Sequence, residues 1–173
     1  NIEVEKFNKN ILIKDQKNSE QNTKELEKYL SLLNQMNSKI SIDLKKYKKL
    51  DDKLKLVKNI YYELKNNIQV KQNKKNIIYE KIGEYKFIYL NAINYPLNCF
   101  KTFIDENKKN NTKSIIVLVS SNEKKVSIII GITDDALDQL DARSLVTLSS
   151  KIVGGSGGGG RKDLAQAGGN DES

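Results

Sequence analysis

Apolar residues recur every seven positions through the first half of the chain, which is typical of a long amphipathic helix. A second apolar series follows the first at an offset of three, with one polar fault at Asp43. No Gly or Pro occurs before Gly83, so no residue forces the helix to stop. Two such series over about six heptads predict a coiled coil from about residue 22 to residue 72. The first series consists of Leu26, Leu33, Ile40, Tyr47, Leu54, Tyr61 and Ile68.

A helix of this length cannot bury its own apolar seam, so it needs a partner. The partner is either a second chain or a segment of the same chain that folds back. ISIDL, residues 40–44, is the favoured place for a kink or reversal. Both arrangements use the same heptad positions, and the sequence leaves them open. In a homodimer, the seam would consist of Leu26, Leu33, Ile40, Tyr47, Leu54 and Tyr61.

The second half of the chain predicts short strands. NIIYEKI and EYKFIYLNA flank Gly83 and are rich in Ile, Tyr and Phe, so they predict a β-hairpin. SIIVLVS and KVSIIIGIT predict a second hairpin. Because these two runs are apolar along their whole length, their strands should lie in the middle of a sheet that is covered on both faces.

Two amphipathic helices alternate with these hairpins. LNCFKTFIDENKKN follows the first hairpin and has its apolar residues on one helical face. After the second hairpin, Asp141 can cap a helix that Gly154 ends. The expected apolar face of that helix consists of Leu145, Leu148, Ile152 and Val153.

The order of these elements predicts an α+β protein. Residues 1–75 would form a long coiled-coil helical subdomain, in which residues 1–20 carry too weak a pattern to be placed. Residues 76–173 would form a small mixed α/β globular subdomain that ends in a glycine-rich loop.

Composition excludes several functions. The chain has 173 residues, one Cys and no His, which rules out Ser-His and Cys-His catalysis and histidine-containing zinc sites. The longest apolar runs are too short to cross a bilayer, and the N-terminal NIEVEKFNKN lacks a secretory core. We therefore expect a cytoplasmic protein with no metal site and no membrane partner, with an organellar location left open.

The net charge of +8 comes from the first half of the chain. Residues 1–90 hold 20 Lys and 12 acidic residues, whereas the charges of residues 91–173 cancel. One explanation is an AT-rich genome, which favours Lys, Asn and Ile codons, and the other is binding to an anionic polymer. The lysines around the seam are then either a solvated exterior or a basic rail that contacts phosphates. The candidate rail consists of Lys45, Lys46, Lys48, Lys49 and Lys53.

The segment VGGSGGGGRKDLAQAGG, residues 153–169, is either a flexible tether or a loop whose backbone comes close to a ligand or to another strand. The amide groups of such a loop can bind phosphate oxygens, and Arg161 and Lys162 can hold the same oxygens by charge. Gly155 and Gly160 have the Walker A spacing. Because Arg161 and Lys162 replace the Lys-Ser/Thr pair of that motif, we do not expect nucleotide hydrolysis.

This segment resembles the glycine-rich signature GGxGGGRPDMAQAGG of the C-terminal domain of alanyl-tRNA synthetases, in the DHH-associated superfamily that also includes RecJ-type nucleases. Upstream, KVSIIIGITDD resembles the family strand and loop KVSLxxGVTxD, and RSLVTLSSKIVGG resembles the family helix ELVxxxAxxVGG. IIVLVS matches the preceding strand, and the heptad helix matches the helical subdomain of the family. The resemblance covers residues 22–172.

The resemblance implies a DHH-associated fold and the tRNA-binding and dimerisation module of an alanine–tRNA ligase. Such a module contacts the outer corner of the alanine tRNA and couples aminoacylation to editing, without catalysis of its own. ATP and zinc would be cofactors only of the catalytic and editing domains of the parent chain. Those domains, the alanine tRNA and a second copy of the chain would be its partners. The alternatives are a mainly structural coiled-coil dimerisation module and a general single-stranded nucleic-acid binder.

The resemblance also implies which residues face the RNA. Asp163 is expected to brace the loop, because a carboxylate repels phosphate. Lys162 stands where the family has Pro, and the chain has one Gly more than the signature, which together favour a looser and more basic loop. The candidate nucleic-acid-binding residues are Gly154, Gly155, Gly157, Gly158, Gly159, Arg161, Lys162, Gln166, Gly168 and Gly169.

Overall fold

The computed structural model describes residues 2–36, 42–123 and 125–170. The chain divides into two compact units, residues 1–65 and 66–173, and the boundary falls within helix α2 (Leu50–Asn73). In the described parts of the chain, every helix is too short or too polar to span a bilayer.

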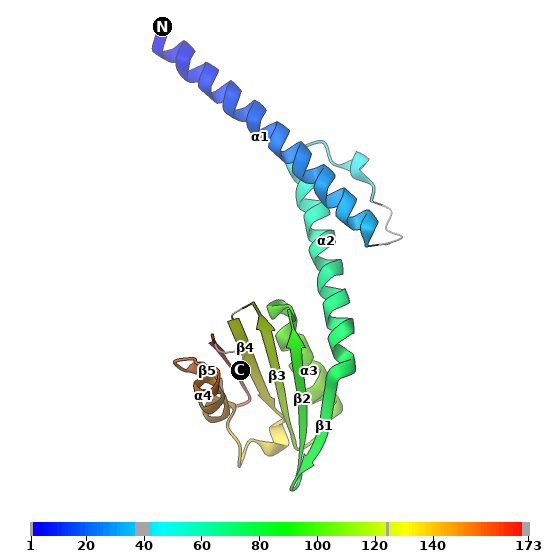
Figure 1. The fold of residues 1–173 in the computed structure, drawn as a ribbon, viewed down its shortest axis with the longest axis vertical. Coiled ribbons are helices and arrows are strands. Elements are labelled where there is room, and N and C mark those ends of the chain that lie inside the picture. Colours follow the sequence, from blue (N-terminus) through cyan, green and yellow to red (C-terminus); the bar gives the residue numbers. More distant parts are fainter. Residues whose placement is uncertain (1, 37–41, 124, 171–173) are drawn as a thin grey trace. The chain divides into compact units, whose positions relative to one another are not determined.

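The first unit contains two helices where the heptad pattern predicted one. Helix α1 runs from Ile2 to Gln35, and α2 begins only at Leu50 (Figure 1). The prediction of one continuous helix from residue 22 to residue 72 is therefore wrong. Asp43, at the polar fault of the pattern, accepts a hydrogen bond from the backbone amide of Lys45 at 3.1 Å. Such local side-chain bonds compete with the backbone bonds that would continue a helix.

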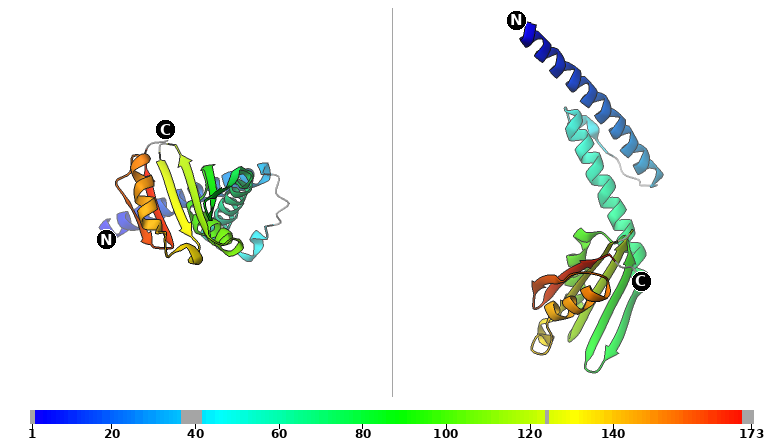
Figure 2. Two further views of the ribbon diagram at one scale, coloured as in Figure 1. Left: turned by 90° about the horizontal axis from the view of Figure 1, so that it is seen from below. Right: turned by 60° about the vertical axis from the view of Figure 1, so that its left-hand side comes forward.

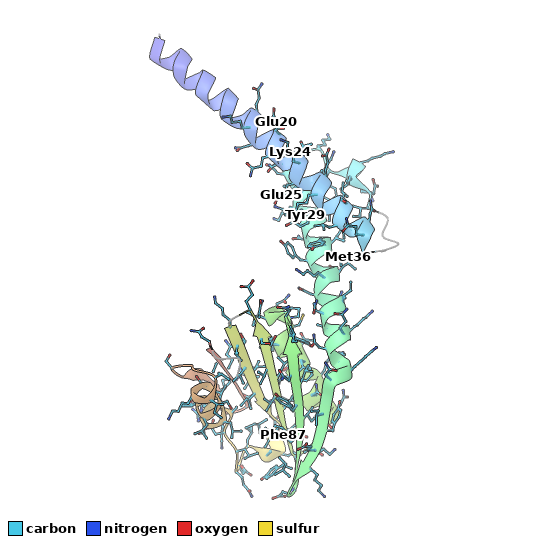
Figure 3. The ribbon with its side chains drawn as sticks, viewed as in Figure 1. Glu20, Lys24, Glu25, Tyr29, Met36 and Phe87 are labelled. Carbon is cyan, nitrogen blue, oxygen red and sulfur yellow. The ribbon has the colours of Figure 1, made fainter. Side chains whose placement is uncertain are left out.

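The two helices of the first unit run in the same direction where they meet. Asn22 of α1 donates a hydrogen bond to Asp51 of α2 at 2.7 Å, and the hydroxyls of Tyr29 and Tyr62, further along both helices, are 2.9 Å apart. Figure 3 labels Tyr29 on this part of α1. A parallel pair requires a connection that returns along the first helix, and of this connection the structure describes residues 36 and 42–49.

The apolar seam is covered within a single chain. Leu33 is 4% exposed and Leu54 is 6% exposed, while Leu26 and Tyr61 are half-buried. This burial favours the alternative in which the chain folds back on itself. A continuous coiled coil is not supported, because the connection between α1 and α2 interrupts the heptad register. The two other seam residues fall in that connection, where Tyr47 is exposed at 36% and Ile40 lies outside the described residues.

The second unit is built on one six-stranded sheet in the order β1-β2-β3-β4-β6-β5. All neighbouring strands are antiparallel except β2 and β3, which are parallel because helix α3 (Phe100–Asn110) connects them as a crossover. Both predicted hairpins, β1–β2 and β3–β4, and the predicted helix α3 are confirmed. The strands are β1 (Ile77–Ile82), β2 (Tyr85–Ile93), β3 (Ser114–Asn122), β4 (Lys125–Ile132), β5 (Gly158–Arg161) and β6 (Leu164–Gly169).

The central strand β4 is buried on both faces, as its apolar sequence predicted, whereas β3 is buried on one face and half-buried on the other. Helix α3 covers one face and α4 (Ala142–Ile152) covers the other (Figure 2). Side chains alternate between the two faces, so each strand contributes to two cores. The α3 core includes Leu90, Phe103, Ile104, Ile116 and Leu118, and the α4 core includes Ile128, Ile130, Ile132, Ala142 and Val146.

Helix α4 begins and ends as predicted but buries a different face. The Asp141 side chain caps it by accepting a hydrogen bond from the Arg143 amide at 2.9 Å, and Gly154 follows it with φ of 67°. Leu148 and Ile152 are 60% and 75% exposed, so the predicted apolar face is wrong at these two positions. The fully buried residues of the helix are Ala142, Val146 and Ser150, two of which are small.

The glycine-rich segment is not a loop throughout. Residues Gly158–Arg161 form strand β5, which pairs with β6 in a hairpin, and β6 in turn pairs with β4. The prediction of a glycine-rich loop is therefore wrong for residues 158–161, and only residues 154–157 connect α4 to the sheet. Glycine has a low intrinsic preference for strands, so only pairing with β6 places this segment in the sheet.

Candidate nucleic-acid interface

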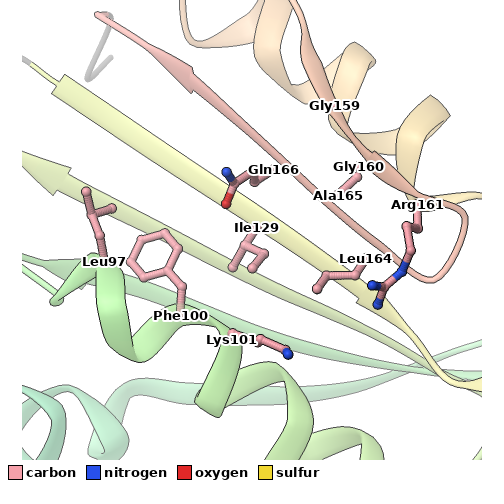
Figure 4. A pocket seen from close by; sticks show the side chains of 10 residues that line it. All are labelled: Leu97, Phe100, Lys101, Ile129, Gly159, Gly160, Arg161, Leu164, Ala165 and Gln166. Carbon is pink, nitrogen blue, oxygen red and sulfur yellow. The ribbon is translucent and has the colours of Figure 1, made fainter.

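A groove follows strand β6 beside the beginning of α3. It consists of three adjoining hollows of about 400, 380 and 380 Å³. Phe100 and Gln166 line the first and second hollows, and Ser127 and Gly168 line the second and third, so neighbouring hollows share walls. This surface is named the β6 groove, and Figure 4 shows its first hollow.

The first hollow has an apolar side and a polar side. Leu97, which is 68% exposed, and Phe100 project from the helix side, while Ile129 lies on the strand side (Figure 4). Gln166 projects from β6 opposite Leu97 and Phe100, and its exposed amide offers both a donor and an acceptor. This arrangement can pack a flat ring or a sugar against carbon while hydrogen bonding to its polar edge.

The charge of the β6 groove is positive. Lys101, Arg161 and Lys125 are the charged side chains among its described lining residues, and Arg161 is paired with Asp163 beside the groove. Cations that line a concave surface raise the local concentration of anions. The groove is therefore suited to a ligand that carries several negative charges.

Arg161 is held in place by a carboxylate at the turn between β5 and β6. Its Nε and one Nη donate hydrogen bonds to Asp163 at 3.0 and 3.3 Å, and Lys108 of α3 lies 3.2 Å from the same carboxylate. The hydrogen bond from Arg161 and then the contact with Lys108 lower the pKa of Asp163 to about 2. The prediction that Asp163 braces this turn is confirmed. The remaining N–H groups of the guanidinium stay available to a ligand.

Four glycines of the segment leave no room for a side chain because they pack closely inside the domain, namely Gly155, Gly158, Gly160 and Gly169. A Cβ atom on Gly155 would overlap the carbonyl oxygen of Gly168 and the hydroxyl of Ser150. On Gly158 it would lie 2.7 Å from the Gln166 carbonyl and 2.9 Å from Val146 of α4. The small side chains of α4 and these glycines together let the helix approach the β5–β6 hairpin closely.

Gly157 and Gly159 are different, because a Cβ atom on either would meet nothing within 4 Å. Of the predicted RNA-facing residues, all but one line the β6 groove, namely Gly154, Gly155, Gly157, Gly158, Gly159, Arg161, Gln166, Gly168 and Gly169. Lys162 is exposed in the hairpin turn and is not among the lining residues. Sequence reasoning missed Leu97, Phe100, Lys101 and Lys125, because only the crossover connection and the strand order bring them to β6.

The lysines of the candidate rail lie in the first unit, and only one of them is in a helix. Lys45 and Lys46 belong to a short 3-10 turn (Leu44–Lys46), Lys48 and Lys49 follow it, and Lys53 lies near the start of α2. The rail is therefore mainly a feature of the connection between α1 and α2, rather than a stripe along a helix.

A model of the DHHA1 domain matches residues 84–173, the part of the chain that forms β2 to β6 and the groove. The chain belongs to the DHHA1 family. Within this family it matches the C-terminal region of alanyl-tRNA synthetases, also named C-Ala.

Similar proteins are alanine–tRNA ligases. The DHHA1 chain is 39% identical over 93 residues to that of Chelativorans sp. (strain BNC1), covering 53% of this chain and 10% of the relative. The chain is 34% identical over 115 residues to the alanine–tRNA ligase of Orientia tsutsugamushi (strain Ikeda), and the match covers 65% of this chain and 13% of the relative. The chain thus spans about a tenth of the length of the curated relatives it matches.

A solved structure supports the same assignment. The C-Ala domain of the Aquifex aeolicus alanyl-tRNA synthetase superposes with a TM-score of 0.53 at 25% sequence identity. The superposition covers 56% of this chain and 86% of the Aquifex chain.

The ion pair at the β5–β6 turn predicts a pH dependence of stability. The pKa of Asp163 is about 2 in the folded domain, against about 3.9 for a free carboxyl. Its stabilisation is therefore complete above about pH 4 and is lost as the pH falls towards 2. We expect Asp163→Asn to lower the free energy of unfolding by roughly 1 kcal/mol at pH 6, because solvent screens a partly exposed pair, and by much less at pH 2.

Urea titrations at several pH values between 2 and 6 measure this difference. Asp138→Asn, at an exposed carboxylate outside the groove, is the matched control. Its difference from the wild type in free energy of unfolding should not shrink between pH 6 and pH 2. A gap between wild type and Asp163→Asn that stays constant down to pH 2 would contradict the assigned ion pair.

Proposed function

We propose that this chain is the tRNA-binding C-terminal module of an alanyl-tRNA synthetase and that its β6 groove contacts the tRNA. One observation carries the proposal: the part of the chain that matches the DHHA1 model also forms three adjoining hollows whose described lining includes three cations and no carboxylate. The curated relatives are named for a reaction on tRNA, which is a polyanion of the kind that such a groove would attract.

The chemistry of the groove suits contact with the RNA backbone. Arg161 presents its free N–H groups beside the groove, and Lys101 and Lys125 add point charges along its length, so phosphates can be held at several places. The apolar side at Leu97 and Phe100 can pack a ribose or an unstacked base, and Gln166 can hydrogen bond to it. Phosphate contacts position a nucleic acid without reading its sequence.

The resemblance to the alanyl-tRNA synthetase family implies a specific role for this module in the parent enzyme. The module would hold the outer corner of the tRNA, where the D and T loops meet. It would thereby keep one tRNA available to both the aminoacylation and the editing domains of the same polypeptide. The groove would contribute affinity and orientation, and discrimination of the alanine tRNA would come from elsewhere in the enzyme.

Binding of the chain to three ligands tests this function. Fluorescence anisotropy at two salt concentrations would compare alanine tRNA, a non-cognate tRNA and single-stranded DNA of equal length. We expect the two tRNAs to bind with similar affinity, both more tightly than the DNA, and chemical footprinting to show protection at the outer corner. Equal binding of the DNA would favour a general single-stranded nucleic-acid binder, and an unprotected outer corner would contradict the proposed contact.

A further inference from the structure

A second basic surface lies in the connection between α1 and α2. Residues 45–49 read Lys-Lys-Tyr-Lys-Lys, and all five are exposed. This stretch is named the KKYKK segment. It belongs to the first unit, whereas the β6 groove belongs to the second.

The backbone of the KKYKK segment is ordered by local hydrogen bonds, although it is not a regular helix. The Asp43 side chain caps the 3-10 turn Leu44–Lys46, and the amide of Tyr47 donates to the Leu44 carbonyl at 3.3 Å. Tyr47 itself is extended, with φ of −104° and ψ of 115°. The turn therefore presents its side chains at a fixed place before α2 begins, instead of distributing them around a helix axis.

The positive charge of the segment is poorly compensated. Among the described residues, the ion pair that involves the segment is Lys46 with Asp43, and its 4.0 Å separation and high exposure make it weak. The next carboxylates, Asp51 and Asp52, lie in the first turn of α2, where they complement the helix dipole. Asp51 also accepts the hydrogen bond from Asn22 of α1.

We infer that the KKYKK segment is a second RNA contact, in which the lysines hold phosphates and Tyr47 stacks on an unstacked base. An exposed aromatic ring between cations is the combination that single-stranded segments of nucleic acid require. A membrane surface is less well matched, because the segment contains no large aliphatic side chain that could enter a bilayer. That the RNA is tRNA rests on the proposed function, whereas the RNA contact itself is inferred from the exposed lysines and Tyr47 of the segment.

A charge-matched pair of variants tests the inference. In the first variant, Lys45, Lys46, Lys48 and Lys49 become Gln. In the control, four exposed lysines elsewhere become Gln, so that the same net charge is removed, namely Lys65, Lys71, Lys81 and Lys86. The two proteins are compared by anisotropy with tRNA over a range of salt concentrations.

We expect the segment variant to lower the slope of log K against log[salt] by roughly 3, as four phosphate contacts require, and to weaken binding at least tenfold. The control should change the affinity less than threefold. An equal loss in both variants would show a net-charge effect and overturn the inference.

The aromatic part is tested separately at high salt, where phosphate contacts are screened. Tyr47→Ala should weaken binding to a short single-stranded RNA about fivefold or more. Tyr47→Phe should bind this RNA as tightly as the wild type, because stacking needs the ring and not the hydroxyl. Equal affinities of the Ala variant and wild type would overturn the stacking contact.

Two further comparisons separate this inference from the proposed function. If the variant that lacks the groove cations Arg161 and Lys101 loses tRNA binding while the four-lysine variant keeps it, the inference fails and the proposed function stands. If the four-lysine variant loses only binding to vesicles containing phosphatidylserine, the segment is a lipid contact and the inference is overturned.

Discussion

Gly155→Ala should lower the free energy of unfolding of the second unit by about 3 kcal/mol, because the added methyl group has no free space. It would overlap the Gly168 carbonyl oxygen of β6 and the hydroxyl of Ser150. Neither can move easily, since the buried Ser150 hydroxyl is bonded to both the amide and the carbonyl of Gly157, at 3.1 and 3.2 Å. Urea unfolding followed by near-ultraviolet circular dichroism measures the shift of the midpoint.

Two other glycines provide the controls for this prediction. Gly159→Ala should change the stability by less than about 1 kcal/mol, because its methyl group would enter open space beside β5. Gly158→Ala should fall between the two, since its closest contacts are 2.7 to 2.9 Å. Equal effects of Gly155→Ala and Gly159→Ala would contradict the conclusion that these glycines serve helix packing.

Arg161→Ala combined with Lys101→Ala should cause the largest loss of tRNA binding of any pair of charge changes in the second unit. Both side chains line the same hollow of the β6 groove, so the variant removes two phosphate contacts at one place. The slope of log K against log[salt] should fall by roughly 1.4 to 1.8. Anisotropy with tRNA at four or more salt concentrations measures the slope, and near-ultraviolet circular dichroism confirms the fold.

The matched control removes two positive charges from the same unit outside the groove. Lys151→Ala with Lys109→Ala serves this purpose, because both side chains are exposed and neither is among the lining residues. Its slope should stay close to that of the wild type. A loss as large as that of the groove variant would mean that the RNA is attracted by overall charge and not held in the groove.

Periodic patterns in the sequence correctly identified the elements whose own residues carry the structural signal. The hairpins β1–β2 and β3–β4 and the helix α3 follow from runs of β-branched or amphipathic residues, and the cap at Asp141 follows from its position before an apolar pattern. The glycine signature also led to the family and to the residues that line most of the β6 groove. These features are local, so nearby residues are sufficient to predict them.

The errors occurred where contacts between distant residues decide the outcome. The heptad pattern continues through the connection between α1 and α2 and therefore predicted one helix. In the structure, Leu33 and Leu54 are buried within a single chain that forms two parallel helices instead. The buried face of α4 has small residues, because close approach to the glycine backbone outweighs burial of the larger Leu148 and Ile152. Neither the break between α1 and α2 nor the buried face of α4 can be read from the residues of those segments alone.

The sequence by itself therefore determined the family, the order of strands and helices in residues 77–153, and the position of the glycine signature. Only the tertiary structure decided that residues 158–161 form an edge strand and that Lys101 and Lys125 join Arg161 in one groove. The physical reason is the distance along the chain. Strand pairing of β6 with β4 and β5, and the crossover through α3, bring together side chains that are up to 69 positions apart, such as Leu97 and Gln166. No local pattern encodes those pairings.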